Sequence, residues 1–149
     1  KLSDGSAISL FETLKSNKSL LSMDLSDCGL TSKVCAMLKD TLKVNTSLLN
    51  VDLGSNPFEA AGIKLIADGL ADNTKIKRFE FSQIEFGDAG IEYLMNKITK
   101  NTALEEAYFC NCKLNDVDGE SIAKALPKLK RLQVLNLDYN GLTDYSAVQ

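Results

Sequence analysis

Residues 48–75 read LLNVDLGSNPFEAAGIKLIADGLADNTK, and the same pattern recurs along the whole chain. Successive copies open at apolar residues that are each 28 positions apart, namely Leu20, Leu48, Ile76, Leu104 and Leu132. A fixed period of this length indicates a stacked array, in which each unit buries its apolar face against its neighbours. The period therefore decides the architecture before any local motif is considered.

The first part of each copy predicts a short strand. In the second copy Leu48, Val51, Leu53 and Asn56 follow the pattern LxxLxLxxN, and Val51 and Leu53 alternate with polar neighbours. Alternation with a period of two is typical of a strand with one buried face. A turn residue such as Pro57 then ends the strand.

The second part of each copy predicts a helix. Apolar residues four positions apart lie on one helix face, and the pairs are Leu38 with Leu42, Ile66 with Leu70, Leu94 with Ile98, and Ile122 with Leu126. One residue type follows each helix at the same position: Asn17, Asn45, Asn73 and Asn101. Because asparagine tolerates the left-handed backbone conformation, we expect these residues to terminate the helices.

Two departures from the pattern bear on the local structure. Ile84 occupies the position of Asn56 and cannot supply side-chain hydrogen bonds, so we expect the turn that follows it to be rearranged locally. Pro127 lies near the end of the fourth full helix, where it is tolerated only if the helix stops early.

The combination of one strand and one long helix in each repeat resembles the ribonuclease-inhibitor-like subfamily of leucine-rich repeats. That subfamily includes tropomodulins, Ran GTPase-activating proteins, NLR receptors and an axonemal dynein-regulatory component. The resemblance implies an α/β leucine-rich-repeat solenoid, a horseshoe arc with a parallel concave sheet and convex helices. We expect a single domain over 1–149 that is part of a longer array, with repeats at 1–19 (partial), 20–47, 48–75, 76–103, 104–131 and 132–149 (partial).

In such a solenoid the second, third, fifth, seventh and eighth residues of each copy should point outward on the concave face. They include seven acidic and two basic residues, although the whole chain has a net charge of only −3. This balance predicts electrostatic steering of a protein partner with a basic surface. The alternative is that the acidic residues only keep the strand face soluble. The candidate partner-binding residues are Asp24, Asp27, Asp52, Arg78, Glu80, Glu106, Tyr108, Asp138 and Tyr139.

The sequence gives no support for catalysis or for a cofactor. The chain has no histidine, no phosphate-binding glycine loop and no zinc spacing among its four cysteines. Cys110 is expected on the concave face, but no activating base lies near it in sequence, which favours an ordinary thiol. The mildly acidic charge argues against nucleic acid or an anionic membrane as the main partner, and no apolar run is long enough to cross a bilayer.

These observations predict a non-catalytic protein–protein interaction scaffold that binds through its acidic concave face and needs no metal or cofactor. Resemblance to tropomodulin and to axonemal proteins implies a cytoplasmic location, in a cytoskeletal complex or in the axoneme of a cilium. One alternative is a GTPase-activating regulator resembling the Ran GTPase-activating proteins, although their acidic tail is not present in this sequence. Another is the ligand-sensing array of an NLR-like receptor, which requires an adjacent nucleotide-binding domain.

Overall fold

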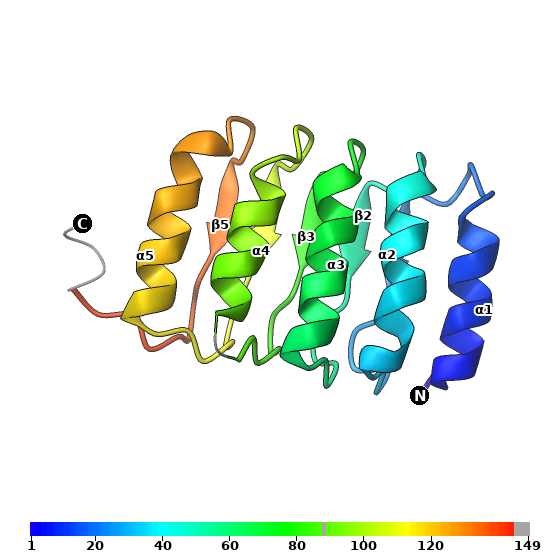
Figure 1. Ribbon diagram of the computed structural model, residues 1–149, viewed down its shortest axis with the longest axis horizontal. Coiled ribbons are helices and arrows are strands. Elements are labelled where there is room, and N and C mark those ends of the chain that lie inside the picture. The colour runs from blue at the N-terminus through cyan, green and yellow to red at the C-terminus, as the bar shows by residue number, and fades with distance from the viewer. Residues whose placement is uncertain (88, 145–149) are drawn as a thin grey trace.

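The computed structural model describes residues 1–87 and 89–144, and within them strands and helices alternate along the chain (Figure 1). The helices are α1 (Asp4–Leu14), α2 (Cys35–Val44), α3 (Ala60–Asp72), α4 (Gly90–Ile98) and α5 (Asp116–Ala125), with short 3-10 helices η1 (Ser32–Val34) and η2 (Leu126–Lys128). The strands are β1 (Ser22–Asp24), β2 (Asn50–Asp52), β3 (Arg78–Glu80), β4 (Glu106–Tyr108) and β5 (Val134–Asn136). Residues 145–149 of the predicted last repeat lie outside the described residues.

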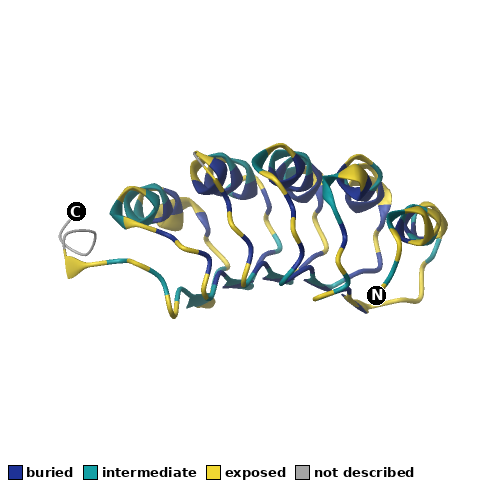
Figure 2. Cartoon of the chain, turned by 90° about the horizontal axis from the view of Figure 1, so that it is seen from below, coloured by how far each residue is buried: buried dark blue, intermediate teal, exposed yellow. Residues whose placement is uncertain are grey.

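The described strands form one parallel sheet in sequence order, β1-β2-β3-β4-β5. Each residue pairs with the residue one full repeat later, as Met23 does with Val51 and Val51 with Phe79. The offset between paired residues of neighbouring strands therefore equals the repeat period of the sequence. The helices cover one side of the sheet, and the opposite side is open (Figure 2). This arrangement confirms the predicted α/β repeat solenoid.

The core lies between the sheet and the helices. Val51, Leu53, Phe79 and Phe81 from the strands and the turns after them are at most 3% exposed. Of the four predicted helical pairs, the first three are buried on both members. The fourth pair is half wrong, because Ile122 is buried but Leu126 is 38% exposed.

The proline explains the misplaced leucine. Helix α5 ends at Ala125, and residues Leu126–Lys128 form the 3-10 helix η2 with Pro127 at its start. Since a 3-10 helix has about 3.0 residues per turn instead of 3.6, the buried face passes from Ala125 to Leu129 and leaves Leu126 outside. The expectation that this helix stops early is confirmed.

The recurring asparagines follow the helices as predicted, but the predicted reason is wrong. At Asn73 the backbone is extended, with φ −82° and ψ 133°, and is not left-handed. Its side-chain amide donates to the carbonyl oxygens of Leu42 (2.7 Å) and Asn45 (3.3 Å), and its Oδ1 accepts the N–H groups of Lys75 and Ile76 (2.8 Å each). Asparagine therefore ends the helix by joining it to the repeat before.

Equivalent bonds recur one repeat away on either side of Asn73. Asn45 donates to the carbonyls of Leu14 and Asn17, and Asn101 to those of Leu70 and Asn73. We call Asn45, Asn73 and Asn101 the asparagine ladder. All three are buried. Their bonds to Leu14, Leu42 and Leu70 satisfy carbonyl groups that the helix ends leave without partners.

The turn after Ile84 differs from that after Asn56, as expected: Gly87 has a positive φ of 63°, whereas Glu59, one repeat earlier, has φ −86°. The hydrogen bonds to the preceding repeat differ as well. The Asn56 side chain accepts the N–H of Leu30 (2.9 Å) in the preceding repeat. The corresponding N–H, that of Phe58, donates instead to the backbone carbonyl of Asn56 (2.8 Å). At the same position in the next repeat, the Cys112 thiol donates to a backbone carbonyl at 3.4 Å. Cysteine thus preserves part of the amide's role, and isoleucine does not.

Candidate functional site

The open side of the sheet carries a row of side chains in register. Asp24 pairs with Asp52, Asp52 with Glu80 and Glu80 with Tyr108 across neighbouring parallel strands. Neighbouring strands lie about 4.8 Å apart, so three carboxylates line up along the face. We call Asp24, Asp52 and Glu80 the acidic column.

Each member of the acidic column also has a structural role. Its carboxylate accepts the backbone N–H two residues later, where the strand gives way to the turn; the donors are Ser26 (2.9 Å), Gly54 (2.9 Å) and Ser82 (3.0 Å). Asn136 accepts the N–H of Asp138 in the same way at 2.8 Å. An amide oxygen can therefore replace the carboxylate in this bond, so the hydrogen bond does not require the charge.

Four of the predicted site residues form one cluster, which shares Glu80 with the acidic column. The Arg78 guanidinium contacts carboxylate oxygens of Glu80 (Nη2, 3.2 Å) and Glu106 (Nε, 3.5 Å), and it lies 4.6 Å from the centre of the Tyr108 ring. The Tyr108 hydroxyl donates to Glu106 at 3.0 Å. The Arg78 guanidinium is thus already paired with carboxylates of the strand face. Asp24 and Asp52 make no ion pair within the described residues.

The two remaining carboxylates have opposite pKa shifts. Burial raises the pKa of Asp52, and the nearby Glu80 and Asp24 charges add to this, while the Gly54 N–H and Arg78 oppose it. Hydrogen bonds from the backbone N–H and the hydroxyl of Ser26 lower the pKa of Asp24. Ionisation of Asp52 is therefore disfavoured in the folded state, whereas ionisation of its neighbour Asp24 is favoured.

This difference predicts opposite effects of two amide substitutions at pH 7. The raised pKa of Asp52 means that its ionisation destabilises the fold, and this penalty appears as pH rises through its ordinary value toward its folded pKa. Asp52→Asn should therefore raise the melting temperature at pH 7. The lowered pKa of Asp24 stabilises the fold above its ordinary pKa and is lost as pH falls through its folded pKa, so Asp24→Asn should lower the melting temperature.

Melting curves of both variants and of wild type at pH 7 and pH 3 test these signs. Both differences should shrink at pH 3, where the aspartates are largely protonated in the unfolded chain. A lower melting temperature for Asp52→Asn at pH 7 would contradict the assignment.

The remaining candidates lie beyond the strands. Asp27, Asp138 and Tyr139 are exposed residues in the turns that follow β1 and β5 and do not belong to the strands themselves. Asp27 and Tyr139 have positive φ values of 48° and 57°. The strands are only three residues long, and the left-handed turn follows within a few residues. These residues therefore form the rim of the face.

The sequence did not reveal a second charge cluster at the opposite rim. The Glu105 carboxylate lies 3.1 Å from both the Lys77 and the Arg131 side-chain nitrogens. These residues come from two successive repeats, and Arg131 belongs to a loop that the strand pattern does not include. The offset of one full repeat between Lys77 and Glu105 is the signal that could have identified this contact.

The thiols offer little nucleophilic chemistry. Burial raises the pKa of Cys35 to about 12 and that of Cys112 to about 11. Cys110, which the strand pattern predicts to be exposed, is half-buried, and it is a free thiol like the other cysteines. Among the described residues no group of carboxylates and thiols is placed to hold a metal ion, and no described helix is long and apolar enough to span a membrane.

Comparisons with known proteins agree with this geometry. The sequence family described as leucine-rich repeat matches residues 44–67. No curated protein matches the chain. Among solved structures, the leiomodin-1 actin-binding site 2 is similar with a TM-score of 0.73 at 18% identity, over 87% of this chain and 75% of that one.

A second similar structure is the tropomodulin C-terminal domain from Caenorhabditis elegans. Its TM-score is 0.78 at 7% identity, over 93% of this chain and 84% of that one. At such identities the likeness concerns the backbone arrangement alone. The register of the sheet also follows the repeat period of the sequence. Together with the similar structures, this establishes that the chain has the leucine-rich-repeat fold, of the long-helix type that its sequence resembles.

Proposed function

We propose that this chain is a non-catalytic protein-interaction module that binds a basic surface of its partner through the open strand face. The observation that carries the proposal is the acidic column. Asp24 and Asp52 lie in register on an uncovered sheet face and form no ion pair within the described residues, while Arg78 is already engaged by Glu80 and Glu106. Such unpaired like charges favour association with a cationic surface.

We further propose a component of the actin cytoskeleton as the first partner to test, within a cytoplasmic cytoskeletal or axonemal complex. Support comes from the similar fold of a structure that is named as an actin-binding site of leiomodin-1. The fold provides the platform, and the side chains on it decide which partner binds.

The double variant Asp52→Asn with Glu80→Gln tests the face. Both amides keep an oxygen that can accept the backbone N–H, as Asn136 shows, so the substitutions remove charge while preserving this bond. A matched control is Glu59→Gln with Glu92→Gln, which removes the same charge from exposed residues at the start of α3 and on α4.

Binding is measured by cosedimentation with actin filaments and by anisotropy with labelled actin monomers, each at low and raised salt. We expect wild type and the control to bind alike, the double variant to bind roughly tenfold more weakly, and raised salt to weaken wild-type binding. Equal binding by the double variant would overturn the acidic face. No binding of either actin form by wild type would overturn actin as the partner.

A further inference from the structure

A hollow of about 270 Å³ opens at the edge of the solenoid where the helices end, between the segment that joins α4 to β4 and the segment that joins α5 to β5. Its lining includes Leu104 and Leu129 as well as Lys128, Lys130 and Arg131. The two leucines are nearly buried, with 4% and 6% of their surface exposed, whereas the three basic side chains are exposed. The hollow therefore has an apolar floor and a basic rim.

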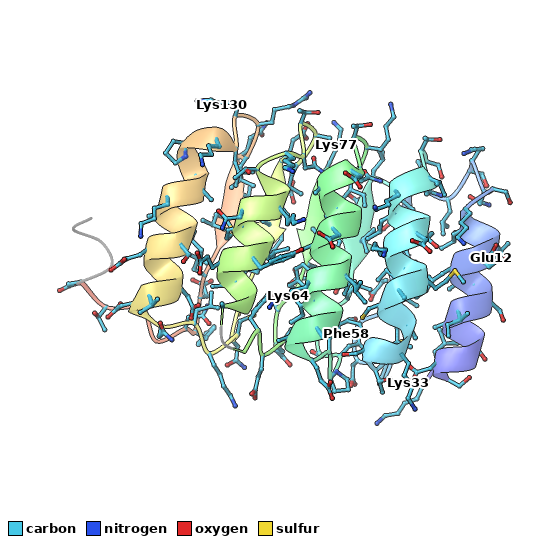
Figure 3. The ribbon with its side chains drawn as sticks, viewed as in Figure 1. Glu12, Lys33, Phe58, Lys64, Lys77 and Lys130 are labelled. Carbon is cyan, nitrogen blue, oxygen red and sulfur yellow. The ribbon has the colours of Figure 1, made fainter. Side chains whose placement is uncertain are left out.

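The basic rim is only partly neutralised. Lys128 and Lys130 have no ion-pair partner within residues 1–87 and 89–144, and Arg131 shares the Glu105 carboxylate with Lys77. Lys130 and Lys77 both lie along the edge where the helices end (Figure 3). Because one carboxylate serves two cations, this end of the edge keeps an excess of positive charge.

The hollow arises where the asparagine ladder stops. Leu129 stands one full repeat after Asn101, at the position where the preceding repeats have a ladder asparagine. A leucine side chain cannot bond to the carbonyl groups of the neighbouring repeat, so it does not close the edge as Asn73 and Asn101 do.

The repeat pattern does not require all three basic residues of the rim. The positions equivalent to Lys128, Lys130 and Arg131 in the preceding repeat hold Lys100, Thr102 and Ala103. Three cations therefore gather where the ladder is interrupted, although the fold is built without two of them in the repeat before. Their coincidence with an apolar floor points to a ligand that has both negative charge and an apolar group.

We propose that this hollow binds a short acidic segment of a protein, with one apolar side chain on Leu104 and Leu129 and its carboxylates against Lys128, Lys130 and Arg131. The wider charge distribution favours a short segment over a nucleic acid or an anionic membrane. The chain carries a net charge of −3, and its strand face bears the acidic column. An extended polyanion meets these repulsive charges, whereas a short segment contacts only the hollow.

A labelled peptide of glutamate and aspartate with one central leucine is the probe, and its binding is measured by fluorescence anisotropy at low salt. The test variant is Lys128→Gln, Lys130→Gln and Arg131→Gln. The control, Lys33→Gln, Lys64→Gln and Lys113→Gln, removes the same charge away from the hollow; Lys33 and Lys64 lie away from the Lys130 edge in Figure 3. Unfolding curves verify that both triple variants fold.

Wild type and the control should bind the peptide equally, and the test variant should lose roughly tenfold or more in affinity. Replacing the peptide leucine by serine should weaken binding severalfold, because the apolar floor then loses its partner. Equal losses in both triple variants would reduce the effect to net charge and overturn the proposal. No peptide binding by wild type, no effect of the leucine, or tighter binding to anionic vesicles or duplex DNA would also overturn it.

Binding by the Asp52→Asn, Glu80→Gln double variant separates this hollow from the strand face. That variant should bind the acidic peptide at least as well as wild type, since it lacks none of the lining residues. A loss comparable to that of the Lys128, Lys130 and Arg131 variant would place the peptide on the strand face and contradict the assignment.

Discussion

Phe81→Ala should destabilise this protein by about 3–5 kcal/mol, the usual cost of emptying a fully buried phenylalanine site. Phe81 is 1% exposed and lies at the centre of an aromatic cluster. Its ring centre is 4.4 Å from that of Phe79, 5.7 Å from Phe86 and 6.2 Å from Phe109. These neighbours come from two successive repeats, so the cavity would weaken both repeats and the interface between them.

Urea unfolding monitored by circular dichroism measures this loss. Phe81→Leu is the first control, because leucine occupies the same position in other repeats, at Leu25 and Leu53, and should cost less than alanine. Tyr139→Ala is the second control: Tyr139 is 85% exposed, so its substitution should leave the unfolding free energy nearly unchanged. If Phe81→Ala unfolds at the wild-type urea concentration, the aromatic cluster does not stabilise the array as described.

The fold could be predicted well because the same pattern of apolar residues occurs in each repeat. The constant repeat length set the register of the sheet, and pairs such as Ile66 with Leu70 set the buried helix faces. The error at Leu126 arose because a spacing of four assumes an α-helix. Pro127 converts the last turn to a 3-10 helix, and the spacing that reaches the core then changes.

The candidate face was predicted only in part. Strand alternation placed Asp24, Asp52 and Glu80 on one side of the sheet, where they form a column. It could not show that Arg78 is engaged by Glu80 and Glu106, because those contacts depend on side-chain conformations within and between strands. The pKa difference between Asp24 and Asp52 likewise depends on burial and on hydrogen bonds, which differ between equivalent positions.

The basic hollow escaped prediction for a different reason. Lys128, Lys130 and Arg131 lie in a loop or a short 3-10 helix, where neither strand nor α-helix spacing indicates which side chains meet. The sequence signal was the leucine at position 129, which interrupts a series of asparagines. This signal could not be interpreted from sequence, because only the structure shows that the asparagines join neighbouring repeats and do not adopt the left-handed conformation.

Asn73→Ala is expected to be the second strongly destabilising substitution, with a loss of at least about 3 kcal/mol, because each buried polar group left unpaired costs about 1–3 kcal/mol and Asn73 serves several of them. The Asn73 side chain makes hydrogen bonds to two carbonyl oxygens of the preceding repeat and to two N–H groups of its own loop. It is 2% exposed, so water cannot readily replace these bonds. Urea unfolding measures the loss.

Asn17→Ala is the matched control, because within the described residues the Asn17 side chain bonds only inside its own loop, and Asn17 is partly exposed. Its Oδ1 accepts the N–H groups of Ser19 and Leu20, and its Nδ2 donates to the Ser19 hydroxyl. Its loss should be clearly smaller in the same urea titration. Asn73→Asp distinguishes the bonds that Asn73 accepts within its own loop from those it donates to the preceding repeat. The carboxylate still accepts the loop N–H groups, but it faces the carbonyls of Leu42 and Asn45 without a proton to donate. The resulting repulsion raises the pKa of the introduced carboxyl in the fold, so the deficit should diminish as the pH is lowered and the group is protonated. Equal losses for Asn17→Ala and Asn73→Ala would show that the asparagines act only within their own loops and do not join one repeat to the next.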